Sequence, residues 1–301
     1  MRLVSFLTGK ASHFGCILGD QVLDLAHPAA ALSRPDPAAA DPADLRGLLA
    51  GGDRALDAVR SLAAEASAGG KAAVALRPLT AVRLAAPLAS ASKIIAVGRN
   101  YLDHASEATV DLPEVPRIFP KWPSTVIGPG EAIVKPAATQ QLDWEVEMGL
   151  VIGKPAHKVP LADALGYVAG YTIVNDVSAR DIQFSKPEQL ALSKNYRTFT
   201  PMGAWVVTPD EFGPPDQATI RAWVNGEIMQ DSSTSKLIFD VPYLVSFLSG
   251  VLDLEPGDVI STGTPSGVGA FRDPPVSLQA GDVVRMELGG VCELENPVID
   301  E

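Results

Sequence analysis

The chain has 301 residues, of which 47% are hydrophobic, and its 36 acidic residues outnumber its 24 basic residues to give a formal charge of −12. This acidic balance, without a run of Lys or Arg, argues against a nucleic-acid or anionic-membrane surface. No apolar run is long enough to cross a bilayer, and the N-terminal apolar stretch is too short for a signal peptide, so we expect a soluble, cytoplasmic protein. Cys16 and Cys292 lie near opposite ends of the chain, which argues against a disulfide framework and a thiolate metal site.

The first 85 residues predict a small α/β unit without a chemical motif. Short strands are expected at 3–7, 14–18 and 21–25. Asp41-Pro42 is typical of a helix N-terminus, and an apolar stripe over 56–66 predicts a second helix that Gly69-Gly70 ends. We therefore predict a small N-terminal domain at 1–85 and a larger domain at 86–301.

The second part begins with a buried strand at 94–97 and a short polar segment. If 101–108 forms one or two helical turns, His104 and Glu107 lie on one face, where the carboxylate can orient the imidazole. A surface His beside a surface Glu is the alternative. Residues 109–124 contain four prolines and predict a long irregular loop that includes Lys121.

An alternating pattern over 142–148 is the strongest chemical signal in the chain. Asp143, Glu145 and Glu147 fall at every second position with large apolar residues between them, so an extended strand places the carboxylates on one side. Such a cluster is tolerated best around a cation, which indicates two ligands of a hard divalent metal. A solvated strand face is the alternative. Asp176, at the end of the next predicted strand, offers a third oxygen ligand.

The remaining elements are predicted to form scaffold and loops around this site. Asn225-Gly226 between two alternating runs predicts a hairpin, and 239–248 predicts a helix with Asp240 as N-cap. Residues 193–203 are interpreted as a site loop. The glycine-rich stretch 262–269 opens no helix and lacks a Gly-Lys-Ser/Thr ending, so it is not a phosphate-binding P-loop, although its amides could hold a carboxylate.

In this order and spacing, the motifs over about 92–298 resemble the fumarylacetoacetate hydrolase family. They are Gly98-Arg99-Asn100-Tyr101 with His104 and Glu107, the Glu145/Glu147 pair, Asp176, Ala179-Arg180-Asp181, Lys194 and Thr262-Gly263-Thr264-Pro265. The resemblance implies an α+β, predominantly β fold, in which a mixed β-sandwich roll follows the small N-terminal α/β domain. It also implies a homodimer, and a Mg²⁺ or Mn²⁺ ion on Glu145, Glu147 and Asp176. Asp143 matches no ligand and is expected behind the site or on the surface.

The resemblance further implies roles for individual side chains. The catalytic candidates are His104, which Glu107 orients to activate a water, and Lys194, which stabilises negative charge. The substrate-binding candidates are Arg99, Lys121, Gln183 and Thr264. Arg180 and Asp181 are expected to form a structural pair. Arg197 replaces an acidic residue usual in the family, so we expect it near the distal end of the substrate.

The implied function is metal-dependent cleavage of a carbon–carbon bond in an acylpyruvate-type 1,3-diketo acid, of the fumarylpyruvate or 2,4-dioxo acid class, to pyruvate and a carboxylic acid. The His104/Glu107 pair favours this hydrolysis because the reaction needs an activated water. The alternatives are an oxaloacetate decarboxylase, a 2-hydroxy-dienoate isomerase or hydratase of the same family, and a catalytically silent metal-binding domain. The expected ligand is a small 2-oxo acid, and fold and metal ligands alone do not distinguish these reactions.

Overall fold

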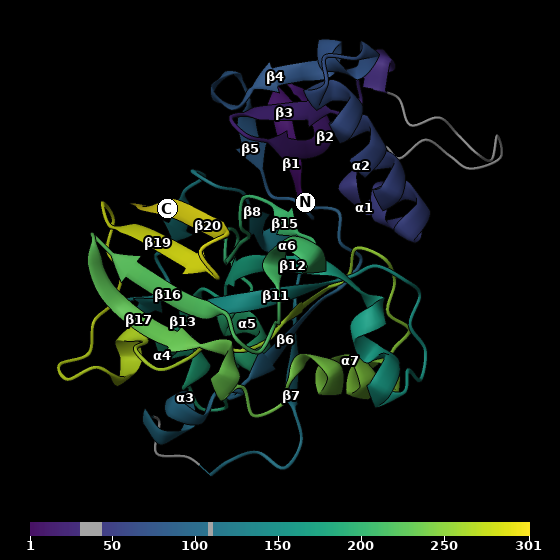
Figure 1. Ribbon diagram of the computed structural model, residues 1–301. Coiled ribbons are helices and arrows are strands. Elements are labelled where there is room, and N and C mark those ends of the chain that lie inside the picture. Colours follow the sequence, from purple (N-terminus) through teal and green to yellow (C-terminus); the bar gives the residue numbers. More distant parts are fainter. Residues whose placement is uncertain (31–43, 108–110) are drawn as a thin grey trace.

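The computed structural model describes residues 1–30, 44–107 and 111–301, and shows a small N-terminal lobe on a larger body (Figure 1). The lobe consists of β1 (Arg2–Thr8), β2 (Ala11–Leu18), β3 (Gln21–Asp24), η1 (Pro28–Ala30), α1 (Leu45–Ala50), α2 (Gly52–Ser67), η2 (Lys71–Ala75), β4 (Leu76–Pro78), η3 (Leu79–Ala81) and β5 (Arg83–Ala85). Asp44 is the N-cap of α1 and accepts from Gly47 N at 2.8 Å. The helix start expected at Asp41-Pro42 lies outside the described residues. In α2 the predicted stripe is buried at Leu56, Val59 and Ala66.

The sheet of the lobe continues into the body. Its order is β4-β3-β2-β1-β15-β12-β11-β18-β6-β7, with β5 on β1, and β1 joins the body where Arg2 pairs with Val207. The strands of the body are β6 (Ile94–Gly98), β7 (Arg117–Lys121), β11 (Val146–Ile152), β12 (Val168–Asn175), β15 (Val206–Val207) and β18 (Val259–Ser261). The division at residue 85 stays a prediction, since hydrogen bonding runs across it.

A second sheet, in the order β17-β16-β19-β20-β9, covers one side of the first. Its strands are β9 (Ile133–Lys135), β16 (Thr219–Val224), β17 (Glu227–Ser233), β19 (Val283–Leu288) and β20 (Cys292–Asp300). Met148 and Leu150 of β11 share one hydrophobic core with Ile220 and Met286 of this sheet. Asn225 and Gly226, with φ of 52° and 82°, form the predicted hairpin turn. The predicted α+β, strand-rich fold is confirmed.

Short elements connect the sheets. They are α3 (Leu102–Glu107), η4 (Pro123–Thr125), β8 (Val126–Ile127), β10 (Leu142–Asp143), η5 (Leu161–Tyr167), β13 (Ser178–Ala179), α4 (Arg180–Gln183), α5 (Leu190–Ser193), β14 (Thr200–Pro201), α6 (Pro209–Phe212), η6 (Thr234–Lys236), α7 (Val241–Ser249) and η7 (Gly269–Phe271). The predicted helix is α7, and its N-cap Asp240 accepts from Tyr243 N at 2.9 Å. Within the described ranges no helix has the length and apolar character needed to span a membrane.

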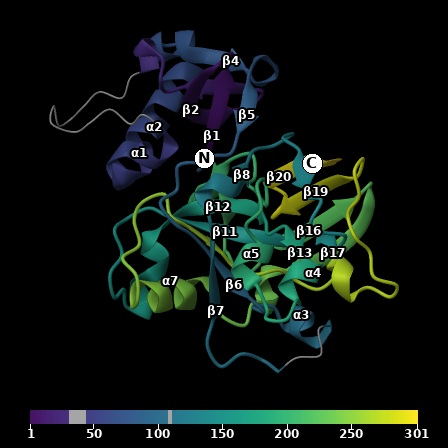
Figure 2. The same cartoon turned by 180° about the vertical axis from the view of Figure 1, so that it is seen from behind.

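The loop predicted at 109–124 is wrong for Arg117–Lys121, which forms β7 against β6. Proline is tolerated at position 120 because β7 pairs only with β6, at the edge of the sheet, where one row of backbone amides needs no partner. Seen from behind, β6 and β7 run down the body toward α3 (Figure 2). The residues of β7 alternate, with Phe119 and Lys121 buried and Ile118 exposed.

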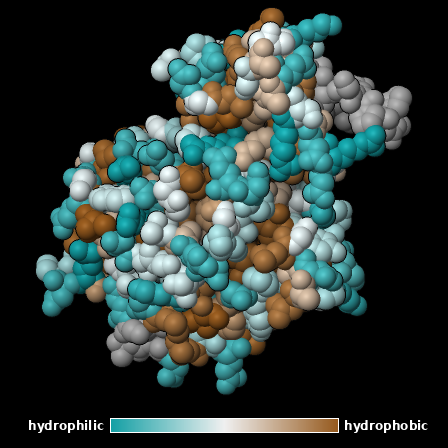
Figure 3. Space-filling view, viewed as in Figure 1, coloured by the Kyte–Doolittle hydropathy of each residue, from teal (hydrophilic) through white to brown (hydrophobic). Residues whose placement is uncertain are grey.

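The single strand predicted over 142–148 is also wrong in part. β10 ends at Asp143 and β11 begins at Val146, so Trp144 and Glu145 lie in a break between two strands. Every residue from 142 to 152 is buried, because the second sheet covers the face that carries Met148. At the molecular surface, hydrophobic side chains lie in small groups between polar ones, including a group at the lower end of the body (Figure 3).

Candidate active site

Antiparallel pairing of β11 with β12 brings three carboxylates together. Val146 lies opposite Asn175, and Asp176 N donates to Glu145 O at 2.9 Å, so Glu145 and Asp176 lie opposite each other. Glu147, two residues beyond Glu145, points to the same face. The carboxylate oxygens of the three acids lie within 4.8 Å of one another, and all three residues are buried. The structure thus assembles the three acids expected as metal ligands.

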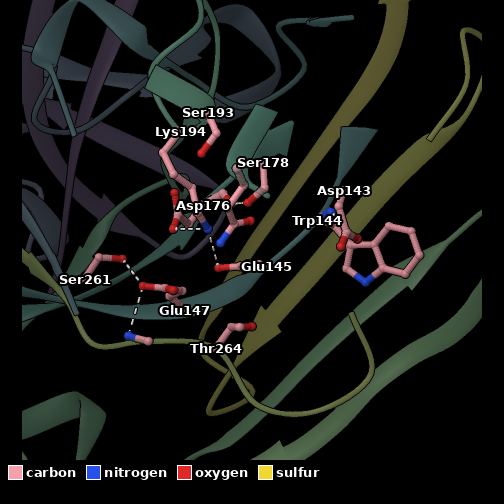
Figure 4. Close-up of polar contacts among 12 residues, drawn as sticks. Asp143, Trp144, Glu145, Glu147, Asp176, Ser178, Ser193, Lys194, Ser261 and Thr264 are labelled. Atoms are coloured by element: carbon pink, nitrogen blue, oxygen red, sulfur yellow. Dashed lines mark hydrogen bonds and ion pairs between the residues drawn. The ribbon is translucent and has the colours of Figure 1, made fainter. Parts of the chain in front are cut away.

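Basic side chains surround two of these acids. Lys194 Nζ lies 2.9 Å from Glu145 Oε2 and 2.7 Å from Asp176 Oδ2 (Figure 4). Lys121 Nζ lies 2.7 Å from Asp176 Oδ1, and Arg180 Nη2 lies 2.7 Å from Glu145 Oε1. Burial would raise the pKa of Glu145, but Lys194 and Arg180 lower it to about 2. Glu145 is therefore held as a carboxylate.

The third acid, Glu147, has a different environment. Its Oε2 accepts from Ser261 Oγ at 2.6 Å and from Gly263 N at 3.0 Å (Figure 4). Burial raises the pKa of Glu147 well above its ordinary value, and the negative charges of Asp176 and Glu145 raise it further. Three buried carboxylates so close together are a donor set that fits a hard divalent cation, which relieves their repulsion. This group could hold a metal ion.

Asp143 and Arg180 lie behind the carboxylates as a buried pair. Arg180 Nε donates to Asp143 Oδ2 at 2.7 Å, and Asp143 is 1% exposed. Asp143 is thus behind the site and not on the surface. The pair expected between Arg180 and Asp181 is wrong, because Asp181 accepts instead from Thr139 Oγ1 and Gln140 N. Arg180 bridges Asp143 and Glu145, and so fixes one metal-ligand candidate from behind.

The short helix α3 places His104 of the predicted dyad near the carboxylates, with Glu107 beside it. His104 Nδ1 lies 3.4 Å from Glu107 Oε2, and neither atom has a hydrogen-bond partner among the described residues. Glu107 Oε1 accepts from Gly267 N at 3.0 Å, which docks α3 on the glycine-rich loop. Asp103 also anchors the helix, because its Oδ2 accepts from Lys236 Nζ at 3.0 Å.

A cavity of about 190 Å³ connects these groups. Of the residues expected in the site, it is lined by Arg99, His104, Glu145, Glu147, Gln183, Lys194 and Thr264. Thr264 Oγ1 donates to Val146 O at 3.0 Å. Lys121 does not line the cavity: it is buried behind Asp176, where its Nζ also donates to Lys194 O and to Phe199 O. Glu107 lies behind His104.

The cavity also contains residues that the sequence did not single out. Arg117 and Glu188 line it, together with Phe119. The alternation of Arg117, Phe119 and Lys121 was the available signal, but the prolines around it obscured the strand. Arg197, expected near the distal end of the substrate, is exposed and does not line the cavity.

Comparison with known proteins places this site in a group of related enzymes. The Fumarylacetoacetate (FAA) hydrolase C-terminal family model matches residues 93–299. The mitochondrial oxaloacetate tautomerase fahd2 of Xenopus laevis is 44% identical over 219 residues, which cover 72% of this chain and 69% of that protein. Several solved structures align with the whole chain, among them two enzymes. The 5-carboxymethyl-2-hydroxymuconate delta-isomerase of Mycobacterium smegmatis has a TM-score of 0.75 at 34% identity and is covered over 100% of its length. The maleylpyruvate hydrolase of Sphingobium sp. SYK-6, solved with manganese(II) and pyruvate, has a TM-score of 0.79 at 30% identity and is covered over 99%.

The same comparison corrects the expected location. The cytoplasmic assignment rested on the absence of a recognisable leader, and it is contradicted because similar proteins from several vertebrates are mitochondrial.

Proposed function

The chain belongs to the fumarylacetoacetate hydrolase family, and we propose that it catalyses a metal-dependent tautomerisation of a 2-oxo acid of the oxaloacetate type. The observation that carries the proposal is that a proton-transfer dyad and three carboxylates line or adjoin one small cavity. The similarity to oxaloacetate tautomerases favours this reaction over the hydrolysis that the sequence motifs first suggested.

The metal would be held by Glu145, Glu147 and Asp176, and Mg²⁺ or Mn²⁺ suits these oxygen donors. When bound, such a cation supplies Lewis-acid stabilisation of negative charge on the substrate oxygens. The cavity is small, which suits a short acid better than a long acyl chain.

The residues of the chain divide the proton transfers between them. In the keto-to-enol direction His104, oriented by Glu107, takes a proton from C3 while the ammonium group of Lys194 gives one to the C2 oxygen, and both transfers reverse in the enol-to-keto direction. Burial lowers the pKa of Lys194, but Asp176 and Glu145 outweigh it and raise the pKa above its ordinary value, so its ammonium group remains a donor beside the C2 oxygen. Thr264 and Gln183 orient the carboxylate end of the substrate. A homodimer stays a prediction.

A substrate panel tests the proposal. Freshly dissolved enolic oxaloacetate is mixed with the protein and Mn²⁺, the enol absorbance is followed, and pyruvate is measured in parallel with lactate dehydrogenase. Faster decay of the enol without pyruvate supports tautomerisation. Pyruvate from oxaloacetate would indicate decarboxylation instead, and an unchanged enol decay would contradict the proposal.

Hydrolysis of an acylpyruvate is the second candidate, and the His104/Glu107 dyad favours it because the same base can activate a water. The similarity of this chain to a maleylpyruvate hydrolase also supports hydrolysis. Pyruvate release from maleylpyruvate or fumarylpyruvate, at a rate above that of oxaloacetate tautomerisation, would make this the principal reaction.

A further inference from the structure

Two arginines lie at the solvent end of the cavity. Arg99 is exposed and Arg117 is 38% exposed on its side chain, whereas Glu145 and Glu147, which line the same cavity, are buried. Gly98 pairs with Arg117 between β6 and β7, and a Cβ at Gly98 would lie 3.8 Å from Arg117 Cδ. The stem of Arg117 therefore lies beside Gly98, the residue that precedes Arg99, and both arginines line the same cavity.

Within the described part of the chain, neither arginine has a strong ion pair or hydrogen bond to its guanidinium group. Among the described residues, none forms a hydrogen bond or ion pair with the side chain of Arg99. Its backbone has φ of 57°, in the left-handed region that a non-glycine residue adopts at a cost. In the described ranges, the ion-pair partner of Arg117 is Glu188, whose Oε2 lies 3.7 Å from Arg117 Nη2 and whose side chain is 69% exposed. A long, exposed ion pair contributes little and exchanges readily for another anion.

The charge of the buried cluster explains what these arginines could bind. Its acids are Asp143, Glu145, Glu147 and Asp176, and its bases are Lys121, Arg180 and Lys194. The acids outnumber the bases by one, so the net charge of the cluster is −1. A bound divalent cation would make it +1, and the substrate carboxylate beside the 2-oxo group would bring it to zero. A second carboxylate on the substrate finds no free positive charge in the cluster. Arg99 and Arg117, offset by Glu188, supply one more at the other end of the cavity.

Building on the proposed function, we infer that Arg99 and Arg117 select 2-oxo acids with a second, distal carboxylate, and that Glu188 holds Arg117 until this carboxylate displaces it. Guanidinium groups suit the task because they bind carboxylates through paired N–H donors. Phe119, two residues from Arg117 on β7, lines the cavity as an apolar wall, and Lys194 Nζ lies 5.6 Å from the centre of its ring. The two ends of the cavity would thus hold the two ends of a dicarboxylic acid.

The test compares oxaloacetate with its 4-methyl ester, which has the same skeleton but no distal charge. We expect Arg99→Met and Arg117→Met each to lower kcat/KM for oxaloacetate roughly 10- to 100-fold, the range for a lost charge-assisted hydrogen bond. The kcat/KM for the ester should change less than about three-fold, because the ester has no distal charge and makes no charge-assisted hydrogen bond that the variants could lose. Glu188→Gln should raise the preference for the diacid, a change in the opposite direction that general damage to the site would not produce. Arg46→Met, in an exposed pair with Glu255, is the control.

A binding measurement separates this inference from the proposed reaction. Calorimetry with Mn²⁺ present uses malate and its 4-methyl ester as unreactive analogues, and oxalate as a ligand too short to reach the arginines. The arginine variants should lose affinity for malate and keep their affinity for oxalate, even if oxaloacetate is not the natural substrate. Equal losses for the diacid and its ester, or unchanged binding of malate, would overturn the inference. Absence of turnover with intact discrimination between malate and its ester would overturn only the proposed function.

Discussion

Replacing Asp143 with Asn should destabilise the protein strongly without creating a cavity. Oδ1 of Asp143 accepts from Trp144 N and Gly269 N, and Oδ2 accepts from Ala270 N and from Arg180 Nε. The Asn side chain keeps one oxygen that can accept two of these hydrogen bonds. Its NH₂ group, itself a donor, would face the other two N–H donors. The change also leaves the guanidinium of Arg180 buried with half of its neutralising charge. Breaking a buried ion pair in this way costs about 3–5 kcal/mol.

An exposed pair of the same chemistry is the control. Asp231 accepts from Arg221 Nε at 2.9 Å, but its side chain is 56% exposed, so Asp231→Asn should cost about 0.2–1 kcal/mol. For 301 residues the entropy of unfolding is about 0.6 kcal/mol/K, so each kcal/mol shifts Tm by about 1.6 °C. Asp143→Asn should therefore lower Tm by about 5–8 °C, against less than about 2 °C for the control. Calorimetric melting and urea unfolding of both variants measure the difference. Equal shifts for the two variants would show that burial of the Asp143 pair does not matter.

Two further predictions concern the helix that carries the base. His104→Ala should lower kcat by about 10²- to 10⁴-fold while Mn²⁺ affinity hardly changes, and Glu107→Gln should have the same effect more weakly, with the exposed His157→Ala as control. A wild-type rate in His104→Ala would show that another residue is the general base. Burial would raise the pKa of Asp103, but its hydrogen bonds, including that from Lys236, lower the pKa below its ordinary value. A carboxyl group with a depressed pKa stabilises the folded state above its unfolded pKa, and this contribution is lost as pH falls through the folded value. Asp103→Asn should therefore be less stable than wild type at neutral pH, with the gap in urea midpoints narrowing below about pH 4. A gap that is constant from pH 7 to about pH 3 would contradict this account.

The elements of the fold that depend on local patterns could be predicted from the sequence. The Asn225-Gly226 turn, the cap of α7 at Asp240 and the apolar stripe of α2 depend on residues close together in the chain, so their patterns are visible without tertiary structure. The carboxylates could be predicted for a related reason. Alternation places Glu145 and Glu147 on one face, Asp176 ends the next predicted strand, and the resemblance to a family assigned all three to one metal ion.

Long-range contacts decided what the sequence did not reveal. Asp143 gains its partners from Gly269 and Ala270, residues more than a hundred positions away, so alternation alone could not place it behind the site. β7 exists because it pairs with β6 at an edge that tolerates proline, and this pairing is what carries Arg117 to the cavity. Lys194 lines the cavity, whereas Lys121 is buried behind Asp176. This difference depends on tertiary packing, so the local sequence pattern did not reveal it.

The central claim is that the three clustered acids hold a divalent cation on which activity depends, and Glu147→Gln tests it most directly. Because burial and the charges of Asp176 and Glu145 raise the pKa of Glu147, the neutral amide resembles the metal-free side chain, and Ser261 and Gly263 can still donate to its oxygen. Melting of wild type and variant is measured in EDTA and in Mn²⁺ at a hundred-fold excess over the wild-type Kd. We predict similar Tm values in EDTA, stabilisation of only the wild type by about 2.7 kcal/mol in Mn²⁺, and loss of oxaloacetate turnover in the variant. Equal stabilisation of both proteins by Mn²⁺ would contradict the assignment of the site.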